Sequence, residues 1–247
     1  MRVAVFSDMH GNDLAFKAVE TDIEKQNVDQ MVCLGDAIQG GPQPSEVVRR
    51  LRRLGCPVVM GNADAWLLSG EETADEGIPP ERLLRMGEIR QWSLSRLTED
   101  DRVFISSFEP TITIPLENKL NLLCFHGSPV SFDDVILPAA PEEEFQKLLG
   151  AYSSYFLTGG HTHAQQIRRI GQHFFFNPGS VGFAYSHNQP NDQFFADPWA
   201  EYAILTVKNG QVSLEFRRVP FDVSRLSQIY RDSKRPYTEE AMAQYRR

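Results

Sequence analysis

A set of potential metal ligands follows short apolar runs in this 247-residue chain, and it includes four of the six histidines. The set consists of Asp8, His10, Asp36, Asn62, His126, His161 and His163. Carboxylate and imidazole groups without thiolate suit manganese, iron, zinc, cobalt or nickel better than a structural zinc of the cysteine type. Histidines scattered through a hydrophobic core would not gather at such positions. The pattern therefore predicts a metal centre.

Two aspartates, four histidines and one asparagine supply enough ligands for two divalent ions if one aspartate contributes to both. Ions about 3.5–4 Å apart share a water, lower its pKa and stabilise the oxygens of an in-line displacement at phosphorus. We therefore expect two divalent ions, with manganese favoured. The expected reaction is hydrolysis of a small phosphorylated substrate.

The candidate ligands require strands that end at one edge of the fold. Continuous apolar runs predict buried strands that stop just before them, at residues 3–6, 31–34, 57–60, 119–125 and 155–158. In open α/β sheets, ligands bind beyond the carboxyl ends of the strands. Asp8-x-His10 alone is more typical of an ordinary turn than of a metal site, so the prediction depends on the five strand ends taken together.

Helices are expected between these strands, after a cap at Asn12 or Asp13, from Ser45 to Leu54 and over residues 141–150. Further strands are expected at residues 111–115, 165–170, 173–176, 201–207 and 211–218, and a helical tail at about 221–247. Residues 65–107 have helical spacing and form a predicted insertion. This insertion either covers the mouth of the site or only packs against the sheet.

The bulk properties narrow the classes of partner. A net charge of −8 disfavours an extended nucleic-acid-binding face, and a nuclease with it. No apolar stretch has the length of a membrane span or of a secretory signal. The three cysteines lie in apolar runs without metal-type spacing, which indicates reduced core thiols in a cytoplasmic protein. We expect a single domain over residues 1–247, and no sequence feature indicates an oligomeric state.

Five short motifs occur in a characteristic order: Asp8-x-His10, Gly35-Asp36, Gly61-Asn62, His126-Gly127 and Gly160-His161-x-His163. In this order they resemble the motifs of the calcineurin-like metallophosphoesterases. Gly41-Pro42-x-Pro44-x-Glu46, His126-Gly127-Ser128-Pro129 and Asn177-Pro178-Gly179-Ser180-Val181 are similar to the small prokaryotic phosphoesterase branch. The resemblance spans about residues 1–220 and implies an α/β fold, a four-layer α/β/β/α sandwich.

The resemblance also implies a distribution of ligands. One metal would take Asp8, His10, Asp36 and His163, and the other would take Asp36, Asn62, His126 and His161. A bridging hydroxide would be the nucleophile at phosphorus, on a small phosphomonoester or phosphodiester.

Two positions depart from the family pattern. Members commonly have histidine after the Gly-Asn pair, where it protonates the leaving group or holds the phosphate, and this chain has Ala63. Members often have a Pro-Arg pair after Asn-Pro-Gly-Ser-Val, and here Phe183-Ala184 follows Gly182, with a polar insertion through Trp199. Two alternatives therefore stay open: an activity like that of a Ser/Thr protein phosphatase, and a metal-binding regulatory module with reduced catalysis.

Overall fold

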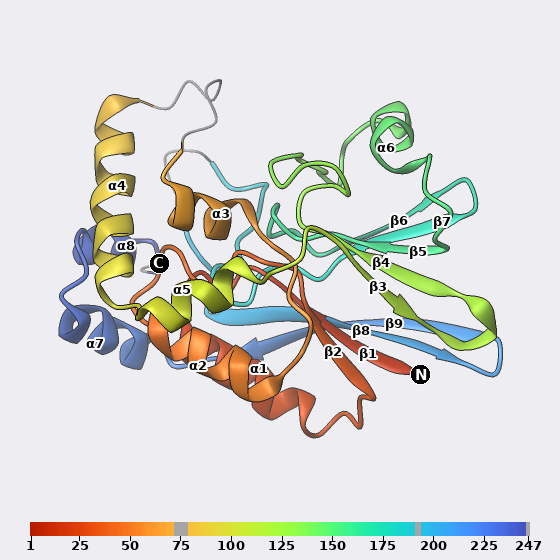
Figure 1. The fold of residues 1–247 in the computed structure, drawn as a ribbon, viewed down its shortest axis with the longest axis horizontal. Helices are drawn as coiled ribbons and strands as arrows, with labels where there is room; N and C mark the ends of the chain where they lie inside the picture. The colour runs from red at the N-terminus through yellow and green to blue at the C-terminus, as the bar shows by residue number, and fades with distance from the viewer. Residues whose placement is uncertain (72–78, 191–193, 246–247) are drawn as a thin grey trace.

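The computed structural model describes residues 1–71, 79–190 and 194–245, and it contains two β-sheets with helices on their outer faces (Figure 1). The first sheet has the order β2-β1-β8-β9. Its strands are β1 (Arg2–Phe6), β2 (Gln30–Cys33), β8 (Trp199–Lys208) and β9 (Gln211–Pro220). β1 pairs with β2 in parallel, whereas β8 is antiparallel to both β1 and β9.

The second sheet has the order β3-β4-β5-β7-β6. Its strands are β3 (Ile112–Pro115), β4 (Asn121–Cys124), β5 (Phe156–Thr158), β6 (Gln166–Ile170) and β7 (His173–Asn177), with a 3₁₀ turn η1 (Glu117–Lys119) between β3 and β4. β4, β5 and β7 run parallel, so their carboxyl ends meet at one edge.

Alternate residues of the strands face different layers. Val3 and Val5 of β1 pack between the two sheets, while Ala4 and Phe6 face the helices. Burial on both faces explains why this strand is a continuous apolar run. On the outer face of the second sheet, Leu123 packs with residues of α6 (Glu142–Leu149). The layers follow the order α/β/β/α, which confirms the predicted fold class.

The helices of the first outer layer are α1 (Asp13–Ile23) and α2 (Pro44–Leu54). Asn12 caps α1, because its side-chain oxygen accepts a hydrogen bond from the backbone of Ala15 at 3.1 Å. The predicted cap at Ser45 is wrong. The helix begins one residue earlier, at Pro44, whose fixed φ favours the first helical position.

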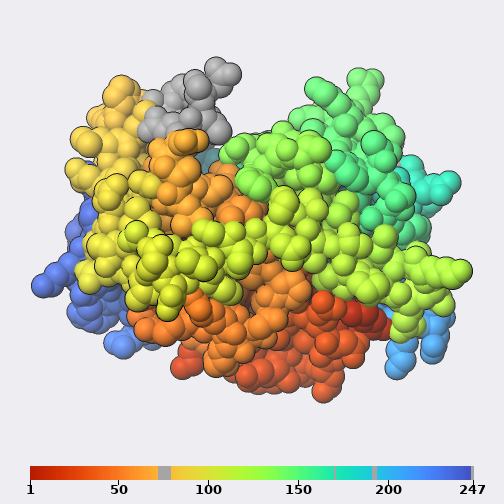
Figure 2. Space-filling view, in the orientation of Figure 1, coloured from red at the N-terminus to blue at the C-terminus, as the bar shows by residue number. Residues whose placement is uncertain are grey.

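The predicted helical insertion contains α3 (Asn62–Ser69), α4 (Pro80–Ser95) and α5 (Glu99–Ser106). Leu67 of α3 and Ile105 of α5 are buried in the core beside the first sheet. Packing is therefore one role of this insertion, and residues 72–78 of it lie outside the described part of the chain. In the space-filling view, α3 and the segment after β4 lie next to each other (Figure 2).

The predicted strand at residues 57–60 is wrong. Only two isolated bridges form there, Cys33 with Val58 and Val59 with Glu109, so this apolar run is buried without joining a ladder. The C-terminal tail is helical as predicted, with α7 (Val223–Ser233) and α8 (Thr238–Ala243). Among the described residues, none of the helices combines the length and the apolar composition needed to cross a bilayer.

Candidate metal centre

All seven predicted ligands lie together at the ends of the central strands. Asp8 and His10 follow β1, Asp36 follows β2, His126 follows β4, and His161 and His163 follow β5. Asn62 differs, because it is the first residue of helix α3. Two groups form: ligand atoms of Asp8, His10 and His163 lie within 4.8 Å of one another, and so do those of Asp36, His126 and His161.

The imidazole rings are oriented by backbone carbonyl groups. Nδ1 of His10 lies 3.0 Å from the carbonyl oxygen of Gln39, and Nδ1 of His163 lies 2.7 Å from that of Phe183. A carbonyl only accepts hydrogen bonds, so Nδ1 is the protonated nitrogen in both rings. In the neutral rings, the Nε2 atoms that carry lone pairs face each other at 3.0 Å. Two lone pairs in this position suit a shared cation.

Asp8 adds a third acceptor to the first group. Its Oδ1 atom is buried without a hydrogen-bond partner, 3.4 Å from Nε2 of His163 and 3.9 Å from Nε2 of His10. Its other oxygen accepts the backbone N–H of His161 at 3.2 Å. A buried carboxylate oxygen with no partner is costly, and a divalent cation would satisfy it. The first group therefore fits a metal ion.

The second group repeats this arrangement. Nδ1 of His126 lies 2.7 Å from the carbonyl oxygen of Leu34, which directs Nε2 toward Asn62 Oδ1 at 3.1 Å and Asp36 Oδ2 at 3.4 Å. Burial alone would lower the pKa of His126, but the Asp36 carboxylate raises it to about 9. The negative charges of Asp36 and Asp8 that raise this pKa would also attract a divalent cation. This second set of acceptors also fits a metal ion.

The backbone of the site occupies an unusual conformation. Eleven described non-glycine residues have positive φ, and five of them are candidate ligands: Asp8, His10, Asp36, His161 and His163. Such residues cost of order 1–3 kcal/mol each and cluster at functional sites. Gly61 permits a close approach, because a Cβ there would lie 2.1 Å from Asp36 Oδ1. Alanine at position 61 would displace that carboxylate.

Other residues support the ligands, and the sequence offered only weak signals for them. The buried carboxylate of Asp64 accepts the backbone N–H groups of Ala37 and Ile38, each at 3.0 Å, and holds the loop after Asp36. Burial and the neighbouring Asp36 raise the pKa of Asp64 to about 7. Asp64 stands two residues after Asn62, so the same turn of α3 carries a candidate ligand and a supporting carboxylate.

Asn177 and Ser180 explain the Asn-Pro-Gly-Ser motif, to which the sequence alone assigned no role. Nδ2 of Asn177 donates to the carbonyl of Gly160 at 2.6 Å, and Oγ of Ser180 donates to the carbonyl of Asp8 at 2.8 Å. The motif therefore ties the histidine loop after β5 to the loop after β1. His187 was also missed, and its Nε2 lies 2.6 Å from the carbonyl oxygen of Thr162, between two ligands.

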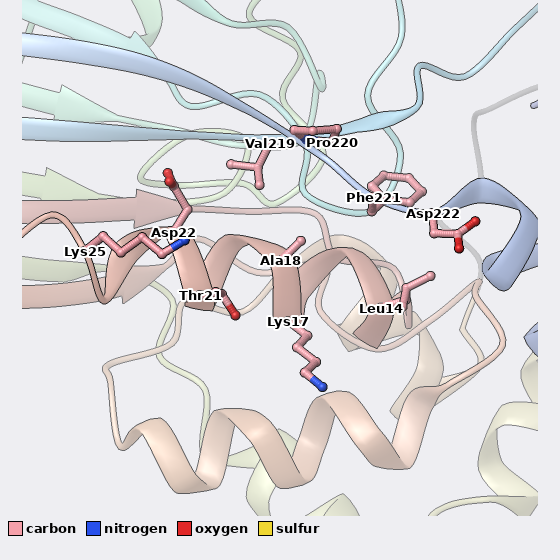
Figure 3. Close-up of a pocket in the computed structure, with 10 residues that line it drawn as sticks. All are labelled: Leu14, Lys17, Ala18, Thr21, Asp22, Lys25, Val219, Pro220, Phe221 and Asp222. Carbon is pink, nitrogen blue, oxygen red and sulfur yellow. The ribbon is translucent and has the colours of Figure 1, made fainter.

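A surface groove of about 440 Å³ lies elsewhere, between α1 and the end of β9 (Figure 3). Leu14 and Phe221 line one end of this groove, and Asp22 and Lys25 line the other. None of the seven candidate ligands lines it. The groove is therefore separate from the metal centre.

The chain is similar in sequence to known proteins. A sequence model described as the calcineurin-like phosphoesterase superfamily domain matches residues 1–210. An uncharacterized protein from Methanocaldococcus jannaschii is 26% identical over 241 residues, which cover 90% of this chain and 89% of that protein.

Two solved structures share the fold. A metallophosphoesterase from Sphaerobacter thermophilus superposes with a TM-score of 0.69 at 24% identity, covering 99% of this chain and 98% of that one. A hypothetical protein from Pyrococcus horikoshii superposes with a TM-score of 0.79 at 18% identity, covering 98% of this chain and 97% of that one.

Proposed function

Because this chain belongs to the calcineurin-like phosphoesterase superfamily, we propose that it is a metal-dependent hydrolase of a small phosphomonoester or phosphodiester. One observation carries the proposal. Nε2 of His10 and Nε2 of His163 converge at 3.0 Å beside the unpartnered Oδ1 of Asp8, and a second set of acceptors surrounds Nε2 of His126. Convergent acceptors of this kind suit divalent cations, which bind phosphoryl oxygens.

Each ion would have four ligands, and Asp36 would belong to both sets. Asp8, His10, Asp36 and His163 would hold one ion, and Asp36, Asn62, His126 and His161 the other. Two divalent ions bound there, with manganese favoured, would supply Lewis acidity toward phosphoryl oxygens and make water a nucleophile at neutral pH.

The protein's own contribution is orientation and charge. The carbonyl groups of Gln39, Leu34 and Phe183 fix the three rings so that Nε2 faces inward. The carboxylates of Asp8 and Asp36 balance the positive charge of the ions. The side-chain amide of Asn62, at the first turn of α3, offers N–H donors to a phosphoryl oxygen.

A metal-binding regulatory module with reduced catalysis is the second candidate. Ala63 favours it, because a methyl group there cannot protonate a leaving group. Retention of all seven ligands favours the enzyme, because a module without chemistry has no need of a complete second metal site. The expected partner of the enzyme is a small phosphorylated molecule in the cytoplasm.

Hydrolysis of 4-nitrophenyl phosphate and bis(4-nitrophenyl) phosphate separates the two candidates. The purified protein is assayed with Mn²⁺, after chelation, and after Mn²⁺ is returned. The enzyme predicts activity that disappears on chelation and recovers with the metal. Two tightly bound ions per chain, with neither ester hydrolysed in the presence of Mn²⁺, Fe²⁺, Zn²⁺, Co²⁺ or Ni²⁺, would instead establish the regulatory module.

A further inference from the structure

Residues 183–187 lie against the loop that carries His161 and His163. The carbonyl of Phe183 accepts the hydrogen bond from His163 Nδ1 at 2.7 Å, and His187 Nε2 lies 2.6 Å from the carbonyl oxygen of Thr162. Between these contacts, the ring of Tyr185 packs on the ring of His163, with centroids 5.6 Å apart. This segment is therefore fixed at the edge of the metal centre.

Three aromatic rings form a surface at this edge, which we call the aromatic shelf: Phe183, Tyr185 and Phe194. Phe183 and Phe194 stack with centroids 5.6 Å apart and an interplanar angle of 28°, and Tyr185 contacts Phe194 edge-on at 4.9 Å. An isolated β-bridge between Tyr185 and Ala196 connects the stretch that carries Phe183 and Tyr185 to the stretch that carries Phe194. All three residues are half-buried, and His187 also packs on the ring of Tyr185, with centroids 4.7 Å apart.

The hydroxyl group of Tyr185 differs in its hydrogen bonding from those of two other tyrosines. In the described part of the chain, the hydroxyl of Tyr185 has no hydrogen-bond partner, whereas Tyr202 donates to Asp22 and Tyr245 to Gly182. A phenol that is half-buried and unpartnered is available to a ligand.

Within residues 1–71, 79–190 and 194–245, no lysine or arginine forms an ion pair with Asp8 or Asp36. On the side of His163, a substrate group outside the metals would meet the uncharged rings of Phe183 and Tyr185. The shelf is an aromatic surface directly beside a candidate ligand, and planar rings stack well on such a surface.

We propose that the aromatic shelf binds the ester group of the substrate and selects phosphate esters that carry a planar aromatic group, either an aryl ring or a nucleobase. This inference rests on the proposed phosphoesterase function. It assigns specificity to Tyr185 and Phe194, which occupy the segment where the family's Pro-Arg pair is replaced.

Inert phosphonates test the proposal without hydrolysis. Binding of phenylphosphonate and methylphosphonate to the Mn²⁺-loaded protein is measured by calorimetry, and AMP and ribose 5-phosphate are compared as competitors that displace bound phenylphosphonate. We expect phenylphosphonate to bind about tenfold more tightly than methylphosphonate, as one stacked ring predicts. A matching preference for AMP identifies the nucleobase as the natural ester group, and its absence identifies an aryl group.

The variants Tyr185→Leu and Phe194→Leu keep apolar volume but remove a ring. Each is expected to reduce the preference for the phenyl compound to about twofold or less. Tyr155→Leu is the matched control, because Tyr155 also packs in an aromatic cluster, with Phe156 and Phe174, but precedes β5 at the end opposite the site. The control should retain the full preference.

Equal affinity of the natural protein for both phosphonates would overturn the proposal. An equal loss of affinity for both phosphonates in Tyr185→Leu would also overturn it, because Tyr185 would then only support His163. The two proposals fail in different ways. Selective binding of phenylphosphonate without hydrolysis of any ester rejects the proposed function and keeps the shelf. Hydrolysis of phenyl and methyl esters with equal kcat/KM keeps the function and rejects the shelf.

Discussion

Oδ2 of Asp36 lies 3.4 Å from Nε2 of His126, on the side of the carboxylate that faces the ligand groups. The same oxygen lies 3.8 Å from Nε2 of His10, so Asp36 reaches both groups. Its other oxygen accepts the backbone N–H of Ala63 at 2.8 Å, which sets the orientation of the carboxylate. Asp36 is therefore the residue placed between the two groups of candidate ligands.

Asp36→Asn is expected to abolish binding of both ions and activity together. The amide oxygen would keep the hydrogen bond from Ala63, which turns the amide N–H₂ toward His126 in place of a metal-binding oxygen. Metal analysis of the purified variant by mass spectrometry gives the number of ions per chain. Asp100→Asn, in the first turn of α5, is the control and should retain both ions. Two ions bound per chain in Asp36→Asn would contradict the bridging role.

Arg235→Gln is expected to weaken metal binding from a distance. Arg235, between α7 and α8, donates from Nε to the carbonyl of Gly40 at 2.5 Å, next to Gln39, whose carbonyl orients His10. Loss of such outer support typically costs 10–100-fold in metal affinity, and we expect about tenfold here because the contact is indirect. Titration with Mn²⁺ measures the affinity. The exposed neighbour substitution Lys234→Gln should leave the affinity unchanged, and equal affinities in all three proteins would refute this supporting role.

Ala63→His is expected to reduce the dependence of the rate on the leaving group. A positioned general acid contributes about 10²–10⁴-fold when the leaving group is a strong base, and little when it is a weak one. Phenyl phosphate and 4-nitrophenyl phosphate make a suitable pair, because both carry one ring and differ mainly in leaving-group basicity. The histidine should therefore raise kcat on the phenyl ester more than on the nitrophenyl ester.

Ala63→Gln is the control for size and polarity, because glutamine carries no proton that it transfers readily at neutral pH. It should leave the ratio of the two rates unchanged. If the natural protein hydrolysed phenyl phosphate and 4-nitrophenyl phosphate at nearly equal rates, departure of the leaving group would not limit the rate.

Asp22→Asn is expected to destabilise the fold by an amount that depends on pH. The Asp22 carboxylate, at the end of α1, accepts hydrogen bonds from Arg217 Nε at 2.7 Å and from the Tyr202 hydroxyl at 2.6 Å (Figure 3 shows Asp22 on its helix). The hydrogen bond from Arg217 lowers the pKa of Asp22 in the folded state. Hydrogen bonds to charged groups contribute about 1.5–3 kcal/mol, and partial exposure favours the lower end.

Because the folded-state pKa is lowered, this stabilisation is present above the usual aspartate value of 3.8 and is lost as the pH falls below it. Urea unfolding of the metal-free protein at pH 7 and pH 3 measures the difference in the free energy of unfolding between the natural protein and Asp22→Asn. The difference should shrink at pH 3. Glu24→Gln, exposed at the same end of α1, should have little effect at either pH, and a constant difference for Asp22→Asn would contradict the ionic origin.

The amino-acid sequence by itself determined the layer order and picked out the candidate ligands. Strands buried on both faces must be continuously apolar, so a polar residue that ends such a run is conspicuous, as Asp8 is after β1. The run at residues 57–60 shows the limit of this signal. It is apolar, and its backbone forms hydrogen bonds with Cys33 and Glu109, yet these make only isolated bridges at Val58 and Val59, because apolarity reports burial and not how far a ladder extends.

The tertiary structure alone decided how the ligands are oriented and supported. The carbonyls that set the rings belong to residues far away in the chain, such as Leu34 for His126, 92 positions apart. Arg235 and Tyr185 reach the site in the same way, from the C-terminal tail and from the polar insertion. Local periodicity describes only residues within a few positions of each other, so contacts of this range become visible only when the sheets have brought their loops to one edge.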